Sequence, residues 1–112
     1  MIAYSRGDVV LVNFVFADES GAKRRPALII SSDAYHRARQ EVVVAAITSN
    51  VRRRLVGDCR IVDWKQAGLL FPSTATGIIR TITRTMIARK LGSMAPTDLQ
   101  NIDRELRRSL DL

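Results

Sequence analysis

Hydrophobic residues along the chain gather in short runs that are separated by polar segments, a pattern typical of β-strands. Val9 to Phe16 is apolar almost throughout, and a run of β-branched and aromatic residues of this length predicts a strand buried on both faces. Similar runs predict further strands, at residues 25–32, 41–48, 59–62, 72–82 and 85–91. The polar segment Ala17 to Arg24, which contains Gly21, predicts a hairpin-type loop between the first two strands.

The last segment has a helical period. Pro96 suits a first helical position, and Asp98 then lies in the first turn, where it complements the helix dipole. Apolar residues recur behind them at spacings of three and four, which predicts one buried stripe. They are Leu99, Ile102, Leu106 and Leu110. Residues 34–40 predict either a short helix or an irregular excursion.

Several short strands closed by one C-terminal helix predict an α+β fold that is mainly β. The expected architecture is a small, strongly bent antiparallel barrel or half-barrel. With 112 residues the chain has room for a single domain, which we expect to span residues 1–112.

The charge of the chain indicates a polyanionic partner. Eighteen Lys and Arg against eleven Asp and Glu give a formal charge of +7, and the sequence pI is near 10.7. Most of the basic residues are arginines, whose planar guanidinium can bind phosphate through two parallel hydrogen bonds. This composition favours nucleic acid as the partner, the alternative being a basic surface kept only for solubility.

The sequence lacks the signatures of several other chemistries. It contains no Cys or His pair with metal-ligand spacing, no Gly-rich phosphate loop and no serine nucleophile elbow, so no metal and no cofactor are expected. The single His36 excludes paired-histidine chemistry within one chain, and the single Cys59 cannot form an internal disulfide. No apolar run approaches the length of a membrane helix, and the N-terminus does not resemble a secretory signal. We therefore expect a cytoplasmic protein that does not enter a membrane.

Two positions at strand ends are candidates for chemistry. Pro26 disfavours helical geometry at Arg25, so that this arginine is held extended where a loop enters a buried strand. Thr48 ends the third apolar run and begins three consecutive hydrogen-bonding residues. If the second and third strands pair, Arg25 and Thr48 border the same rim of the sheet. The alternatives are a surface arginine that pairs with an acid and an ordinary polar strand end.

Other polar residues near these positions could support nucleic-acid binding or proton transfer. The predicted binding residues are Lys23, Arg24, Ser49, Arg52, Arg80 and Arg84. Glu19 and His36 are the candidate acids or bases, although a lone histidine is more often a surface residue than a catalyst.

Several blocks of the sequence, in this order and spacing, resemble the MazF/PemK family of toxins. The blocks are Gly7–Phe14, Arg25–Ser32, Val42–Ser49, Gly68-Leu69 with Pro72-Ser73, and Ile79–Ile82. The resemblance as a whole spans about residues 6 to 110, nearly the whole chain.

The resemblance implies an SH3-like barrel of the plasmid-maintenance-toxin type, usually a homodimer, inhibited by an acidic antitoxin. It also implies sequence-selective cleavage of single-stranded RNA, often messenger RNA. In that family the Arg of the Arg-Pro block and the Thr that ends the Ile-Thr block carry catalysis, and these are Arg25 and Thr48 here. Cleavage without a metal can use the 2′-hydroxyl as nucleophile. The competing hypotheses are a CcdB-like toxin that poisons gyrase and a non-catalytic RNA-binding barrel.

Overall fold

The computed structural model describes residues 3–15 and 22–112, which form six strands, two α-helices and one 3₁₀ turn. The strands are β1 (Asp8–Val15), β2 (Ala22–Ile29), β3 (Glu41–Thr48), β4 (Cys59–Ile61), β5 (Ser73–Thr83) and β6 (Ile87–Ser93). The helices are α1 (Asp33–Ala38) and α2 (Pro96–Leu110), and the 3₁₀ turn is Arg84–Met86.

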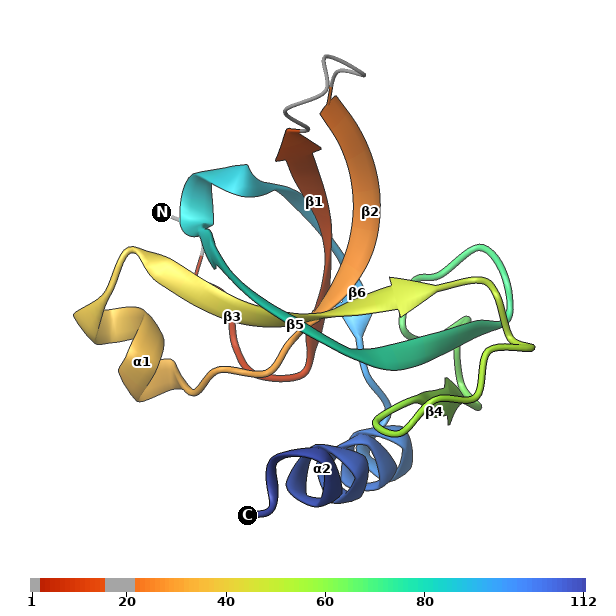
Figure 1. Cartoon of the computed structure of the whole chain (residues 1–112). Coiled ribbons are helices and arrows are strands. Elements are labelled where there is room, and N and C mark those ends of the chain that lie inside the picture. Colours follow the sequence, from red (N-terminus) through yellow and green to blue (C-terminus); the bar gives the residue numbers. More distant parts are fainter. Residues whose placement is uncertain (1–2, 16–21) are drawn as a thin grey trace.

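The strands form one antiparallel sheet in the order β4-β5-β3-β2-β1-β6. The sheet is strongly curled, with β1 and β2 rising away from β3 and β5, while α2 packs beside β4 at its other side (Figure 1). Register shifts between β3 and β5 and between β1 and β6 mark irregularities that increase local bending. This arrangement confirms the predicted half-barrel with a C-terminal helix.

Two hydrophobic cores lie on opposite faces of the sheet. One core contains Ile102 and Leu106 of α2 together with Ile47 of β3. The other contains Val42 and Val44, because successive side chains of a strand point to opposite faces. β3 therefore contributes to both cores, which explains why its sequence is apolar without the alternation of a half-exposed strand.

The strand limits differ from the predictions where pairing or capping intervenes. β3 has the predicted limits, whereas the prediction of a strand over 25–32 is wrong at both ends. β2 begins at Ala22 because its first residues pair with the end of β1. It ends before Ser32, because the Ser32 hydroxyl accepts a hydrogen bond from the Tyr35 backbone N–H and caps α1. The last strand, predicted over 85–91, begins at Ile87 after the 3₁₀ turn and ends at Ser93. Phe16 and most of the predicted loop lie outside the described residues.

α2 begins at Pro96 as predicted, and its apolar stripe is buried at Ile102 and Leu106. Leu110 does not join them, since 53% of it is exposed. Asp98 does more than complement the helix dipole: it is buried and accepts hydrogen bonds from the backbone N–H groups of Val62 and Asp63 at 2.9 and 2.8 Å. Within the described ranges, neither helix has the length and apolar character required to cross a membrane.

Candidate active site

Arg25 and Thr48 lie at the same end of two neighbouring strands. β2 and β3 pair antiparallel, and the last paired residues at this end are Ala27 and Ala46. Arg25 precedes Ala27 by two residues and Thr48 follows Ala46 by two, so both side chains continue the same face of the sheet. Beyond this pair β2 and β3 separate (Figure 1). The geometry therefore brings the two predicted residues to one rim.

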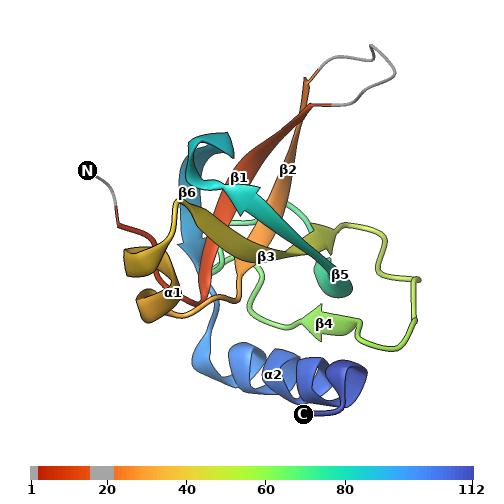
Figure 2. The same ribbon diagram turned by 60° about the vertical axis from the view of Figure 1, so that its left-hand side comes forward.

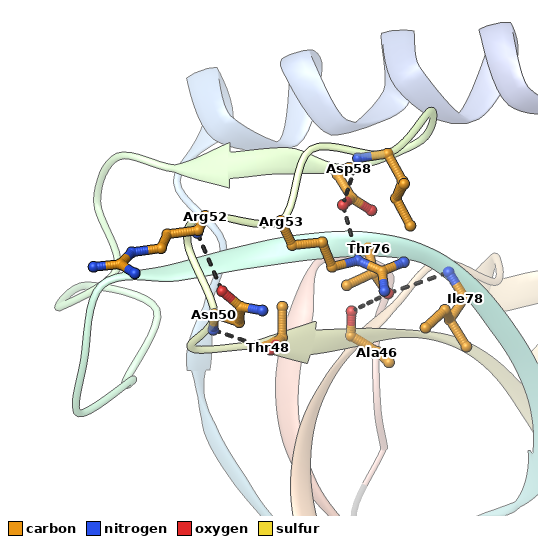
Figure 3. A network of polar contacts seen from close by, with 9 residues as sticks. Ala46, Thr48, Asn50, Arg52, Arg53, Asp58, Thr76 and Ile78 are labelled. Carbon is orange, nitrogen blue, oxygen red and sulfur yellow. Dashed lines mark hydrogen bonds and ion pairs between the residues drawn. The ribbon is translucent and has the colours of Figure 1, made fainter.

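The Thr48 hydroxyl is oriented by the turn that follows β3. Its Oγ1 accepts a hydrogen bond from the backbone N–H of Asn50 at 3.1 Å, and Oδ1 of Asn50 accepts one from the backbone N–H of Arg52 at 3.3 Å (Figure 3). Because the oxygen already accepts a bond, the hydroxyl proton is left to donate to a ligand. Side chain and backbone thus fix the direction in which Thr48 can donate.

Arg25 is an exposed cation with no hydrogen bond or ion pair to any residue in the described ranges. It lies opposite Val12 of β1, on the face that carries Ala27 and Ile29. Arg24 points to the other face, where its Nε donates to Oδ1 of Asn13 at 3.0 Å. The alternation of the strand therefore directs these two adjacent arginines to opposite faces.

Two other predicted binding residues share this face of the sheet, and two lie in the loop after β3. Arg80 of β5 is opposite Val44 and so shares the face of Thr48, and its guanidinium carbon lies 4.9 Å from the centre of the Phe14 ring. Lys23 lies opposite Phe14 on the same face and is exposed. Ser49 and Arg52 are exposed in the loop after β3.

Two predicted residues are placed elsewhere. The Arg84 guanidinium donates to the backbone carbonyls of His36 and Arg39 at 2.6 and 3.1 Å, so it caps the C-terminal end of α1. His36 is buried, which corrects the expectation of a surface residue. Its Nδ1 lies 2.9 Å from the Tyr4 carbonyl oxygen and its Nε2 lies 2.5 Å from Oγ of Ser31, so both ring nitrogens are engaged within the fold. Glu19 lies outside the described residues.

The loop 49–58, which follows Thr48, is anchored by Asp58, a residue that the sequence analysis did not select. Oδ2 of Asp58 accepts hydrogen bonds from Nε of Arg53 at 2.9 Å and from the backbone N–H of Leu55 at 3.1 Å (Figure 3). The Gly57-Asp58 pair is a turn signal that could have pointed to it.

The same loop packs closely on β5. Gly57 has a φ of +95°, and a Cβ there would lie 3.1 Å from Cα of Gly77 and 2.8 Å from Oγ of Ser109. Thr76, beside Gly77, donates from Oγ1 to the Ala46 carbonyl at 2.7 Å. The end of β3, the loop and the irregular part of β5 are therefore held together as one unit.

Neither the Cys59 thiol nor a cluster of metal-ligating side chains stands out among the described residues. Burial, followed by the charges of Asp98 and Glu105, raises the pKa of the Cys59 thiol, which disfavours the reactive thiolate. Over the two described ranges, no three His, Cys, Asp or Glu side chains group together as metal ligands.

Comparison with solved structures supports the fold. A MazE–MazF complex from Deinococcus radiodurans superposes with a TM-score of 0.83 at 19% sequence identity, over 100% of this chain and 99% of that one. An endoribonuclease in complex with its cognate antitoxin, from a mycobacterial species, gives a TM-score of 0.76 at 23% identity, over 100% and 97%. At these identities the likeness establishes a shared architecture.

Comparison of sequences establishes the family. The endoribonuclease MazF6 of Mycobacterium tuberculosis is 32% identical, over 81% of this chain and 82% of the relative. Residues 5–110 match the family described as PemK-like, MazF-like toxin of type II toxin–antitoxin systems. This chain belongs to that family of toxins.

Proposed function

We propose that this toxin is an endoribonuclease that cleaves single-stranded RNA without a metal, with Arg25 and Thr48 as its catalytic residues. The observation that carries the proposal is the placement of these two side chains at the same end and on the same face of β2 and β3. A guanidinium that has no partner among the described residues and an oriented hydroxyl at one rim are the donors that a phosphodiester requires.

The reaction proceeds by attack of the neighbouring 2′-oxygen on phosphorus. The bond from phosphorus to the 5′-oxygen breaks, and the products are a 2′,3′-cyclic phosphate and a free 5′-hydroxyl. Negative charge gathers on the phosphate oxygens in the transition state, and a preorganised donor aimed at that charge contributes about 3 kcal/mol. Arg25 supplies charge and two parallel N–H groups, and Thr48 supplies a directed O–H.

The remaining residues of the rim position the strand of RNA. Arg80, Lys23, Arg52 and Ser49 are the proposed contacts to phosphate and sugar, while Arg24 and Arg84 are left out because their guanidinium groups are engaged elsewhere. Glu19 stays a candidate for proton transfer. His36 is not included, because both of its ring nitrogens already have partners within the fold.

The test compares two arginine variants that change the charge equally. Arg25→Ala removes the proposed donor at the rim, whereas Arg37→Ala removes an exposed arginine of α1, at the opposite end of the molecule from β4 (Figures 1 and 2). We expect Arg25→Ala to reduce cleavage of a long RNA by at least about two orders of magnitude. We expect Arg37→Ala to cleave like the wild type, with circular dichroism confirming that both variants fold.

Two further conditions define the reaction. Cleavage should persist in the presence of a chelator, and a substrate with a single deoxyribose at the cut position should resist, because the nucleophile is missing. RNA binding without cleavage by the wild-type protein, or full activity of Arg25→Ala, would contradict the proposal.

The proposal extends to the partners of the toxin. A basic rim suits an acidic antitoxin segment that orders as it binds. The two solved structures named above are a MazE–MazF complex and an endoribonuclease in complex with its cognate antitoxin. We also propose a homodimer, supported by exposed aliphatic side chains near the end of α2. We propose messenger RNA as the substrate, and a toxin that cleaves messenger RNA acts in the cytoplasm.

A further inference from the structure

A row of residues leads from Thr48 across the sheet to its edge. Thr48 of β3 pairs with Thr74 of β5, and Thr74 pairs with Arg60 of β4. Residues directly opposite each other in antiparallel strands share a face, so all three belong to the face of the candidate active site. Neighbouring strands lie about 4.8 Å apart, so Arg60 is roughly 10 Å from Thr48 along this row.

At the end of the row there is an arginine-lined pocket. It has a volume of about 400 Å³ and lies between the loop 51–58, β4 and the last turns of α2. Thr74 lines it, together with four arginines: Arg53, Arg54, Arg60 and Arg108. The acids in its lining are Asp58 and Glu105, so the formal charge of the lining is +2.

Two of the four arginines of this pocket have acidic partners, and two have none among the described residues. Arg53 donates to Asp58, and Arg108 lies 3.8 Å from Glu105. Arg54 and Arg60 are exposed and have no hydrogen bond or ion pair with any residue that the structure describes. The two acids in the lining are therefore matched by two of the arginines, and two guanidinium groups remain for a ligand.

The loop that forms one wall of the pocket is anchored at Asp58. Asp58 holds both Arg53 and the Leu55 backbone, whereas Arg52 points away from Asp58 (Figure 3). An anion that enters the pocket thus meets arginines in a preformed wall, and less ordering entropy is lost than in a mobile loop.

We propose that this arginine-lined pocket binds a phosphate of the RNA strand that flanks the cut site. This inference rests on the proposed function, since it extends the same strand of RNA from Thr48 across β5 to β4. The lining also includes Val51, Leu55 and Val56. The ligand is a backbone phosphodiester, because Arg54 and Arg60, which have no partner among the described residues, match its two free oxygens. A phosphate contact carries no base information, so the pocket adds affinity without adding sequence preference.

The test uses the double variant Arg54→Gln/Arg60→Gln with two RNA substrates. Cut sites are first mapped on a long RNA by end sequencing. One substrate is then a short oligonucleotide restricted to the cut site, and the other carries the same site with several nucleotides added on both sides. The matched control is Arg37→Gln combined with Arg89→Gln, two exposed arginines on α1 and β6.

For the extended RNA we expect the double variant to raise KM on the order of tenfold with kcat unchanged. For the short RNA we expect no change, because it does not reach the pocket. The dependence of affinity on salt should also weaken, with the log–log slope falling by about 0.7 for each lost phosphate contact on a single strand. The control variant should match the wild type on both substrates.

Each other outcome has a defined meaning. Equal kinetics of wild type and double variant on both substrates, while Arg25→Ala is inactive, would overturn the pocket and leave the proposed function intact. A double variant that binds RNA normally but loses affinity for an acidic peptide, such as oligoglutamate, would also overturn it and would assign the pocket to a protein partner. Absence of RNA cleavage by the wild type would instead contradict the proposed function itself.

Discussion

At the scale of single residues, the site depends on whether a polar group already has a partner. Arg24 and Arg25 are adjacent in sequence, yet the first is bonded to Asn13 and the second has no partner in the described ranges. Thr48 is bonded through its oxygen and keeps its proton to donate. The chemistry proposed for the rim follows from these differences in hydrogen bonding more than from net charge.

Substitutions at Thr48 separate its hydroxyl from its shape. Thr48→Val preserves the branched side chain but removes both the donor and the acceptor of the Asn50 N–H. We expect it to lower kcat on the order of 10²-fold while leaving KM nearly unchanged, because the lost bond acts on the transition state. Thr48→Ser retains the hydroxyl and should keep most of the activity. Equal rates for the Val and Ser variants would remove Thr48 from the mechanism.

The sequence could indicate Arg25 and Thr48 but not the partners of their neighbours. Pro26 and the end of an apolar run are local signals, and both predicted residues lie at one rim. The assignment of Arg84 to α1 and of His36 to a buried position depends on contacts between segments 32 to 48 residues apart. Periodicity and composition carry no information on such contacts, which are settled only when the sheet curls.

At the scale of elements, the C-terminal helix and the edge strand are joined by one carboxylate. Asp98 in the first turn of α2 accepts the backbone N–H groups of Val62 and Asp63, immediately after β4. β4 is only three residues long and pairs with β5 alone. The buried carboxylate therefore stabilises the edge of the sheet on which Arg60 lies.

Removal of the Asp98 carboxylate should lower the free energy of unfolding more than removal of the Asp103 carboxylate on the same helix. Asp98→Ala leaves two backbone donors without an acceptor, and we expect the free energy of unfolding to fall by about 3 kcal/mol. Asp103→Ala removes only a partly exposed ion pair with Arg6 and should cost no more than about 1 kcal/mol. Urea denaturation followed by circular dichroism measures both. Similar losses in the two variants would mean that Asp98 does not anchor β4.

The limits of the elements show where sequence patterns fail at this scale. β3 and α2 were predicted well because burial on both faces and a helical stripe leave strong periodic signals. The start of β2 was missed because Lys23 and Arg24 are polar, and their extended form comes from pairing with β1. Leu110 fits the stripe of α2 yet is exposed, because α2 continues beyond the core that covers its earlier turns.

At the scale of the whole molecule, one surface is more apolar than a monomer requires. Ile78, Leu110 and Leu112 are exposed by 49, 53 and 86%. Ile78 follows Gly77 and Leu110 follows Ser109, two residues that Gly57 approaches closely. Exposed aliphatic side chains on neighbouring segments are typical of a protein interface, which supports the proposed homodimer.

A charged substitution tests this surface. We expect Leu110→Asp to halve the molecular mass measured by sedimentation equilibrium, since a buried, unpaired carboxylate opposes association. Leu70→Asp is the matched control. Leu70 is 83% exposed, and it lies in the segment between β4 and β5 instead of on this surface. A wild-type protein that sediments as a monomer, or a Leu110→Asp protein that remains a dimer, would contradict the homodimer.

The contribution of β3 to both hydrophobic cores has a genetic consequence. Val42, Val44 and Ile47 fix this strand from both sides, and the strand ends in Thr48. Damage to either core therefore displaces the same hydroxyl. When cells are selected for survival while they express the toxin, inactivating substitutions should accumulate at consecutive positions along β3. A strand with only one buried face would show such substitutions at every second codon.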